Sequence, residues 1–217
     1  MALTSTSTIK VIIADDHAIL REGLKQILAE TEDIEVVADA KNAAEAIKLA
    51  GTKGLDVLVL DISLPDRSGI DACNIIRKEH PRVAVLMLSM HREDAYAIRA
   101  LRAGASGYLS KQGASDQLVT AIRTVAKGKK YISPEVALAL ADQVDGGLDK
   151  PMHDCLSNRE FQTLTMIASG LSVSEIADNL SLSVKTVSMY RARLLEKLNL
   201  RHNAELTHYA IKNNLID

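Results

Sequence analysis

The sequence predicts an α/β fold, a doubly wound five-stranded parallel sheet, followed by a small all-α domain. Short β-branched runs alternate with helix-like segments up to about residue 130, which is typical of βαβ units. The alternation breaks between residues 142 and 154, where two adjacent glycines, a proline and several charges indicate a linker. Beyond the linker, helical periodicity continues without a strand pattern.

Strands are expected at the buried apolar runs, over residues 10–14, 34–40, 57–60, 83–89 and 107–109. The first helix is expected between the first two strands, because Leu20, Leu24, Ile27 and Leu28 share one helical face. Later helices are expected over residues 43–47, after 69, from 93, and over 117–126. A short helix is expected over 134–141, with Ser133 as its cap and Pro134 at its first position.

Four further helices are expected after the linker. Ser157 and Ser172 each stand three residues before a glutamate, which is capping-box spacing, and Gly170 ends the first helix. A turn over 181–183 separates the second helix from a third over 184–198, and the fourth spans 203–213. Short helix, tight turn and longer helix form the outline of a helix-turn-helix. The expected organisation is a flexible tail at 1–8, an α/β domain at 9–130, a linker with a short helix at 131–153, and a helix-turn-helix domain at 154–217.

Composition narrows the class of protein. A net charge of −2 means that any nucleic-acid contact must come from a local basic patch. Cys73 and Cys155 lie far apart and form no C-x-x-C motif, which favours a reducing, cytoplasmic location. Residues 1–8 lack the basic and apolar regions of a signal peptide, and no apolar run approaches membrane-spanning length, so no membrane partner is expected.

Polar residues follow the ends of the expected strands. Asp15 and Asp16 follow the first strand, Asp61 the third, Ser89 ends the fourth, and Lys111 comes just after the fifth. In open α/β sheets the ligand crevice lies beyond the carboxyl ends of the strands, so these side chains should converge. Three carboxylates repel one another unless a hard divalent cation such as Mg²⁺ joins them, while a lysine and a hydroxyl suit an anionic oxygen. This pattern indicates an aspartate that accepts a phosphoryl group.

Each of these residues also has a simpler interpretation. An aspartate after a strand can be the N-cap of the next helix, Lys111 a solvated surface residue, and Ser89 a turn residue. Tyr108, taken alone, is typical of a core or rim position. The joint placement of the whole set at the strand ends favours the site.

The first domain resembles the receiver domain of bacterial two-component response regulators, a flavodoxin-like fold, over about residues 9–130. The motifs that carry the resemblance are Asp15-Asp16, Asp61 with Leu64-Pro65-Asp66 and Gly69, Ser89, and Gly104-Ala105-x-Gly107-Tyr108-Leu109-x-Lys111. The resemblance implies that Asp61 is the phosphoacceptor from a sensor histidine kinase. It also implies Mg²⁺ ligands at Asp15, Asp16, Asp61 and the Ser63 backbone carbonyl, contact of Lys111 with the phosphoryl group, and a switch pair of Ser89 and Tyr108. Gln112 stands where many receivers have a cis proline, which leaves the isomer of the Lys111–Gln112 peptide open.

The third helix of the second domain has an apolar and a polar face. Val187, Leu194 and Leu198 form the apolar stripe, with Tyr190 and Leu195 at its edges. Between residues 185 and 201, five basic residues stand against one acidic residue, namely Lys185, Arg191, Arg193, Lys197 and Arg201 against Glu196. The stripe is either a solvated helix face or a surface that enters a DNA groove, and the preceding capped helix and turn favour DNA.

This domain resembles the LuxR-type helix-turn-helix over about residues 154–217. The motifs are Leu156-Ser157-x-Arg159-Glu160, Gly170, Glu175-Ile176-Ala177, Leu182-Ser183, Lys185-Thr186-Val187 and Lys197-Leu198. Together with the receiver it resembles the NarL/FixJ subfamily of response regulators, which implies transcription control by dimers on double-stranded promoter DNA, with RNA polymerase as a further candidate partner. The residues expected at DNA are Lys185, Thr186, Ser188, Met189, Tyr190, Ala192 and Arg193. The last helix, with Leu206, Tyr209, Ala210 and Ile211, is expected at the dimer face, although its stripe could equally be core packing.

Two other functions fit parts of the pattern. An aspartate-nucleophile phosphatase of the haloacid-dehalogenase type has a similar metal pocket, but needs a second carboxylate two residues after its nucleophile. Ser63 stands at that place, so turnover of an external substrate is not expected and the chain is interpreted as a regulator, not an enzyme. The other alternative is a phosphorylation-independent regulator, against which the complete set of pocket residues argues.

Overall fold

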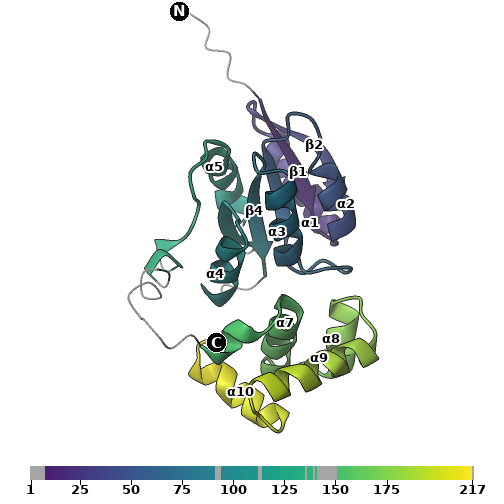
Figure 1. Ribbon diagram of the computed structural model, residues 1–217. Coiled ribbons are helices and arrows are strands. Elements are labelled where there is room, and N and C mark those ends of the chain that lie inside the picture. Colours follow the sequence, from purple (N-terminus) through teal and green to yellow (C-terminus); the bar gives the residue numbers. More distant parts are fainter. Residues whose placement is uncertain are drawn as a thin grey trace, which may run out of the picture. The chain divides into compact units, whose positions relative to one another are not determined.

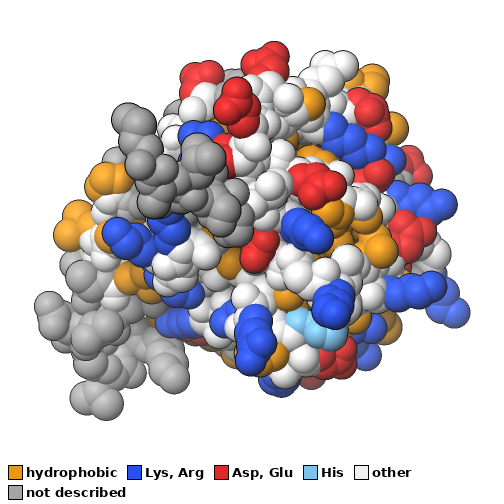
Figure 2. Space-filling model, turned by 90° about the horizontal axis from the view of Figure 1, so that it is seen from above, with side chains coloured by type: hydrophobic (Ala, Val, Ile, Leu, Met, Phe, Trp, Pro, Cys, Tyr) orange, Lys and Arg blue, Asp and Glu red, His pale blue; other side chains and the backbone are white. Residues whose placement is uncertain are grey.

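The computed structural model describes residues 8–90, 94–111, 114–134, 136–138, 140 and 151–216. The chain forms two compact units that divide between residues 138 and 139. The predicted tail lies outside the described residues except for Thr8, as do residues 142–150 of the predicted linker and the Lys111–Gln112 peptide. Lysine and arginine side chains and acidic side chains both occur on the face seen in Figure 2, in keeping with the net charge of −2.

Unit 1 is built on a five-stranded parallel sheet with the strand order β2-β1-β3-β4-β5 (Figure 1). The strands are β1 (Ile9–Ala14), β2 (Ile34–Ala40), β3 (Val57–Asp61), β4 (Ala84–Ser89) and β5 (Gly107–Ser110). The helices are α1 (Ala18–Ala29), α2 (Ala43–Leu49), α3 (Gly69–Glu79), α4 (Asp94–Arg102) and α5 (Ala114–Ala126). The doubly wound sheet is confirmed, with strand ends within one residue of the prediction.

Helices cover both faces of the sheet, because α1 contacts α5, whereas α2 contacts α3 and α3 contacts α4. The core between them consists of β-branched and leucine side chains from the central strands, together with Leu24 and Leu28 of α1 and Leu118 and Ile122 of α5. Helix α5 begins three residues before its predicted start at 117, and the predicted start of α4 at residue 93 lies outside the described residues.

The chain returns to the sheet after α5. Tyr131 forms an isolated parallel bridge with Gly107, so its backbone N–H donates to Ser106 and its carbonyl accepts from Tyr108, both at 3.0 Å. Residues 134, 136–138 and 140 are then helical. The side chain of Ser133 accepts from the Val136 N–H at 3.2 Å, as expected for the cap.

Unit 2 is helical throughout its described part. Its elements are a 3₁₀ helix η2 (Met152–Cys155) and the α-helices α7 (Asn158–Ala168), α8 (Val173–Asn179), α9 (Val184–Lys197) and α10 (Asn203–Lys212). Both predicted capping boxes form, and Gly170 takes a φ of 92°, the left-handed conformation that ends α7. One boundary differs from the prediction, because residues 152 and 153 belong to η2 and not to an irregular linker. Among the described helices, none combines the length and the apolar character that a membrane span requires.

Candidate functional site

The strand order places the predicted acidic residues together. β1 lies beside β3 with Ala14 opposite Leu60, so Asp15 and Asp61 emerge from neighbouring strands at the same edge of the sheet. Asp61 is 1 % exposed and Asp15 is fully buried. A Cβ at Gly69 would lie 1.9 Å from the Asp61 carbonyl oxygen. The start of α3 can therefore pass this close behind Asp61 only with glycine at position 69.

Lys111 follows β5 and reaches across the strand ends. Its Nζ lies 2.6 Å from Asp15 Oδ2 and 2.8 Å from Asp61 Oδ2, and its side chain is 4 % exposed. These contacts rule out the interpretation of Lys111 as a solvated surface residue. One ammonium group therefore bridges the two most deeply buried carboxylates of the site.

One cation does not satisfy the carboxylates. Asp15, Asp16, His17 and Asp61 each offer a ligand atom, all within 4.8 Å of one another. Within the described part of the chain, Asp15 Oδ2, Asp16 Oδ1 and Asp61 Oδ2 are buried without a hydrogen bond, although Lys111 and His17 approach them at ion-pair distances. Buried carboxylate oxygens without hydrogen bonds are costly, and oxygen ligands suit a hard divalent cation. The arrangement fits a metal site.

The pKa values show the same imbalance of charge. Burial raises the pKa of Asp61 from 3.8 to about 6, and the neighbouring Asp15 adds to this shift, although Lys111 opposes it. Burial works against the charge of Lys111, but Asp61 and Asp15 outweigh it and raise the pKa of the ammonium group. Lys111 therefore stays charged, while the raised pKa of Asp61 means that this carboxylate takes up a proton at a higher pH than an exposed aspartate does.

The remaining predicted pocket residues come from β4, β5 and the loop after Asp61. Ser89 ends β4 and is buried, and Tyr108 lies in β5, the next strand, almost fully buried. The Ser63 N–H donates to the Asp61 carboxylate, which favours its charged form. A place for Tyr108 in the core or rim is thus compatible with its burial.

Sequence reasoning missed side chains that hold the loops of this site. His17 N–H donates to Asp15 Oδ1 at 2.8 Å, and its Nδ1 lies 2.8 Å from Asp16 Oδ1. Asp66, in the loop after Asp61, accepts from the Ala43 and Ala44 N–H groups at 2.8 and 2.9 Å. Adjacency to the aspartate pair could have flagged His17. No sequence signal joins Asp66 to the start of α2, because that contact spans more than twenty residues.

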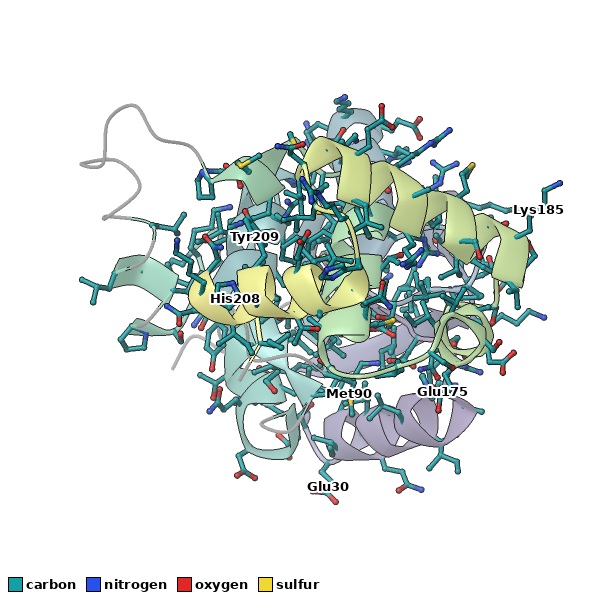
Figure 3. All side chains as sticks on the ribbon, turned by 90° about the horizontal axis from the view of Figure 1, so that it is seen from below. Glu30, Met90, Glu175, Lys185, His208 and Tyr209 are labelled. Carbon is teal, nitrogen blue, oxygen red and sulfur yellow. The ribbon has the colours of Figure 1, made fainter. Side chains whose placement is uncertain are left out.

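In unit 2 the predicted apolar stripe of α9 is confirmed, since Val187, Leu194 and Leu198 are buried. The predicted DNA-facing residues Lys185, Ser188, Met189, Ala192 and Arg193 are exposed, whereas Thr186 and Tyr190 are half-buried. Figure 3 shows Lys185 extending outward from the amino-terminal part of α9. The N-cap Ser183 accepts from the Thr186 N–H at 3.1 Å and contacts the Thr186 hydroxyl at 2.7 Å.

Two of the five basic residues of α9 and its flank have structural partners. Lys197 Nζ lies 2.6 Å from Glu160 Oε2, and Arg191 Nε donates to the Asn203 side chain at 2.7 Å. For Lys185 and Arg193, no ion pair forms with any residue that the structure describes. The basic surface of α9 is therefore smaller than the sequence predicts and is centred on Lys185 and Arg193.

The predicted dimer face of α10 needs a correction. Leu206 and Ala210 are buried in unit 2, where α10 packs on α7, and the Tyr209 hydroxyl bonds to the N–H and Nδ1 of His153 at 3.1 Å. Core packing thus accounts for Leu206 and Ala210, whereas Tyr209 is half-buried. Ile211, 56 % exposed, is the member of the predicted face that remains at the surface.

Comparison with known proteins identifies both units. The family described as response regulator receiver domain matches residues 11–123, and the family described as bacterial regulatory proteins, luxR family, matches residues 154–210. The response regulator UvrY of Escherichia coli (strain K12) is 38 % identical over 208 residues, which are 95 % of this chain and 95 % of that protein.

Two solved structures of RcsB resemble most of the chain, and one of them is of RcsB from Salmonella enterica serovar Typhimurium. RcsB bound to a promoter in the presence of the phosphomimetic BeF₃⁻ has a TM-score of 0.62 and 29 % identity, covering 94 % of this chain and 98 % of that one. A structure of two RcsB dimers bound to two parallel DNAs has a TM-score of 0.58 and 29 % identity, with the same coverage.

Proposed function

The chain belongs to the NarL/FixJ family of two-component response regulators, with a receiver domain and a LuxR-type helix-turn-helix domain, and from that premise we propose that Asp61 accepts a phosphoryl group from a sensor histidine kinase. The observation that carries the proposal is the cluster of Asp15, Asp16 and Asp61, whose ligand atoms lie within 4.8 Å of one another, with the Lys111 ammonium group bridging Asp15 and Asp61. Mg²⁺ is the proposed cation, held by Asp15, Asp16, Asp61 and the Ser63 carbonyl. Bound there, it supplies the charge neutralisation that phosphoryl transfer requires.

The side chains of the pocket have different roles in the proposed phosphoryl transfer. A carboxylate oxygen of Asp61 forms a bond to phosphorus while the bond from phosphorus to the imidazole nitrogen of the kinase phosphohistidine breaks, and the electron pair leaves with the imidazole. Lys111, already 2.8 Å from Asp61 Oδ2, holds an anionic phosphoryl oxygen. Ser89 at the end of β4 turns its hydroxyl to the phosphoryl group, and Tyr108 moves with it.

Mass measurement tests the acceptor. The full-length protein incubated with acetyl phosphate and Mg²⁺ should gain the mass of one phosphoryl group, and Asp61→Asn should gain none. Asp33→Asn, which removes an aspartate outside the pocket, should be phosphorylated as the wild type is. A persistent phospho-adduct on Asp61→Asn would place the acceptor elsewhere, and no adduct on the wild type would favour a phosphorylation-independent regulator.

We further propose that α9 enters the major groove of promoter DNA. The support is an exposed surface of Lys185, Ser188, Met189, Ala192 and Arg193 on a helix whose opposite face is buried, preceded by a capped helix and a tight turn. Thr186 and Tyr190, at the edges of this surface, complete the proposed contacts. Lys185 and Arg193 contact phosphates, while Ser188 and Met189 contact base edges.

Salt dependence separates the two kinds of contact. Lys185→Ala in the phosphorylated full-length protein should weaken binding on all sequences and reduce the salt slope by about 1. Met189→Ala should leave the slope unchanged and shift base preference by roughly 1–3 kcal/mol per lost contact. Arg123→Ala, in α5 of unit 1, is the control for general loss of positive charge. The assignment of contacts is wrong if Lys185→Ala alters base preference with an intact slope.

The solved RcsB dimers on DNA support the proposal that this chain also binds DNA as a homodimer, and RNA polymerase is a further proposed partner. A regulator that receives phosphoryl groups and binds promoters would act in the cytoplasm. Phosphorylation should raise DNA affinity by shifting an equilibrium between states of the two units, with a coupling of about 1–3 kcal/mol, or roughly 5–150-fold. Titration of one DNA site with wild-type protein and with Asp61→Asn, each treated with acetyl phosphate, measures this coupling.

A further inference from the structure

Behind the acidic pocket, the guanidinium group of Arg21 joins the ends of two strands. Arg21 lies in α1, one turn after the aspartate pair. Its Nη1 donates to the Asp15 carbonyl oxygen at 2.7 Å, and its Nε donates to Asp39 Oδ2 at 3.0 Å. Asp39 is the penultimate residue of β2, the edge strand beside β1. The Arg21 side chain is only 14 % exposed, so it is confined among these partners.

We propose that Arg21, oriented by Asp39, is a positioning residue that fixes the loop carrying Asp15 and Asp16 for cation binding; the proposal rests on the metal site of the proposed function. The Asp15 backbone is held from two sides, since its N–H donates to the Ala40 carbonyl at 3.1 Å and its carbonyl accepts from Arg21. The planar guanidinium presents donors in a fixed fork, so it can engage both partners at once. Residues that orient metal ligands are commonly needed for full affinity although they never touch the ion.

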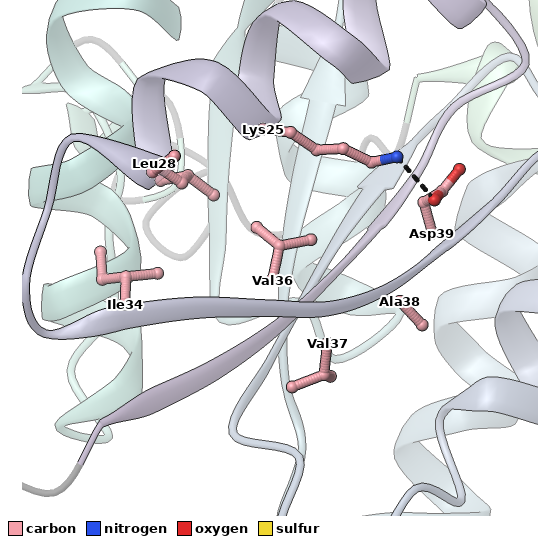
Figure 4. A pocket seen from close by; sticks show the side chains of 8 residues that line it. Lys25, Leu28, Ile34, Val36, Val37, Ala38 and Asp39 are labelled. Carbon is pink, nitrogen blue, oxygen red and sulfur yellow. Dashed lines mark ion pairs between the residues drawn. The ribbon is translucent and has the colours of Figure 1, made fainter.

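Lys25 provides a matched comparison within the same helix. Its Nζ lies 2.7 Å from Asp39 Oδ1, on the other oxygen of the same carboxylate, and Figure 4 shows this ion pair among the side chains that line a pocket between α1 and β2. Hydrogen bonding to Asp39 and Glu22 raises the pKa of Lys25, so it is a charged partner just as Arg21 is. None of the described contacts of Lys25 reaches the Asp15 loop.

An electrostatic effect and a positioning role predict opposite changes in cation affinity when Arg21 is replaced. Arg21→Gln removes a positive charge beside a cluster of carboxylates, which by itself makes the cluster more attractive to a divalent cation. If the guanidinium fixes the loop, the same substitution leaves the Asp15 carbonyl without its donor and loosens the ligands, which weakens binding. The direction of the change in affinity therefore decides between the two effects.

The test measures cation affinity directly in the full-length protein. Mn²⁺, a paramagnetic substitute for Mg²⁺, is titrated by electron paramagnetic resonance into the wild type, Arg21→Gln, Arg21→Lys and Lys25→Gln, and Mg²⁺ competition confirms that the site is shared. Arg21→Gln should weaken binding about tenfold, and Arg21→Lys should weaken it too, because an ammonium group keeps the charge but lacks the fork. Lys25→Gln should bind as the wild type does or slightly more tightly.

Asp39→Asn completes the set, because it keeps Arg21 but removes the charge that orients it, and it should weaken Mn²⁺ binding less than Arg21→Gln. Thermal unfolding in EDTA compares the melting temperatures of Arg21→Gln and Lys25→Gln. General destabilisation from the loss of a contact with Asp39 should lower the melting temperature of both variants, whereas a positioning role weakens Mn²⁺ binding in Arg21→Gln alone. Equal or tighter binding by Arg21→Gln than by the wild type would overturn the positioning role while leaving the metal site intact. Failure of the wild type itself to bind Mn²⁺ would instead overturn the metal site of the proposed function.

Discussion

Asp61 in unit 1 and Glu160 in unit 2 are both buried carboxylates paired with a lysine, yet their pKa values move in opposite directions. Burial raises the pKa of Asp61 to about 6 despite Lys111, partly because Asp15 shares the same ammonium group. Burial would also raise the pKa of Glu160, but hydrogen bonds from Lys197 and Ser157 outweigh it and hold the pKa below its usual value of 4.5. Two features differ: Asp61 lies deeper within the protein and shares its lysine with a second carboxylate, Asp15, whereas Lys197 pairs with no carboxylate other than Glu160 among the residues that the structure describes.

This difference distinguishes a candidate functional site from a contact that only stabilises the fold. Glu160 closes the capping box of α7 and links the start of α7 to the end of α9 through Lys197. Its negative charge is therefore compensated by contacts within the fold. The Asp15 and Asp61 carboxylates share one ammonium group, and a third carboxylate, Asp16, lies in the same cluster. Charge that the fold leaves uncompensated is available to a metal ion and a phosphoryl group.

The largest expected effect is the removal of the shared cation. Lys111→Met leaves Asp15 and Asp61 facing each other in a buried site, which should lower the free energy of unfolding in EDTA by about 3 kcal/mol or more. Lys197→Met leaves Glu160 with its Ser157 hydrogen bonds and should cost about 1 kcal/mol. Urea denaturation with and without Mg²⁺ makes the comparison, since Mg²⁺ should restore stability only to Lys111→Met. Equal losses in both variants, insensitive to Mg²⁺, would remove the distinction between the two carboxylate sites.

Neutralising Asp61 should stabilise the protein. The shift of its pKa from 3.8 to about 6 corresponds to at most about 3 kcal/mol, at 1.36 kcal/mol per unit. Because the folded-state pKa is raised, the wild type keeps the full benefit of protonated Asp61 below about pH 4 and loses it as the pH rises to about 6. Asp61→Asn in EDTA should therefore match the wild type at pH 4 and exceed it at pH 7. A stability difference that does not change between pH 4 and pH 7 would contradict the raised pKa.

Neutralising Glu160 should do the reverse. Glu160→Gln keeps an amide oxygen that can accept from the Ser157 N–H but loses the charge-assisted contact with Lys197, which should cost about 2 kcal/mol at pH 7. Because the folded-state pKa is lowered, this stabilisation is present above pH 4.5 and disappears as the pH falls through the lower folded value. Glu175→Gln, in the exposed capping box of α8, is the control and should lose less. Acid titration of unfolding by circular dichroism would record the two opposite pH windows.

The pocket was predictable from the sequence because its members occupy the ends of strands. Strand runs are local patterns, and a parallel sheet brings their carboxyl ends to one edge, so the pattern alone places Asp15, Asp61 and Lys111 together. The residues behind the pocket were not predictable, because Arg21 meets Asp39 across the gap between a helix and an edge strand. Such contacts depend on the reach of side chains, which periodicity does not encode.

Unit 2 also shows that sequence patterns do not predict tertiary contacts. Its helices and caps follow from local spacing, but the apolar stripe of α10 could not reveal whether it faces a second copy or its own core, and the structure places Leu206 and Ala210 in the core. The charge of Lys197 suggested a groove-facing role, but its ammonium group contacts Glu160 instead. Patterns thus identify a face, whereas only packing identifies what covers it.

The smallest expected effect concerns the steric cost of a backbone conformation and involves no charge. Ser181, in the turn between α8 and α9, adopts a φ of 52°, in the left-handed region, while Leu182 N–H donates to the Ala177 carbonyl at 2.8 Å. Ser181→Gly removes the steric cost of that conformation, about 1–2 kcal/mol, but adds freedom to the unfolded chain, so the net gain should be under about 1 kcal/mol. Asn199→Gly, at a φ of 53° after α9, should gain less, because asparagine tolerates this region better. Since backbone conformation does not titrate or bind cations, both gains should be the same at pH 4 and pH 7 and with or without Mg²⁺, unlike every variant at Asp61 or Lys111.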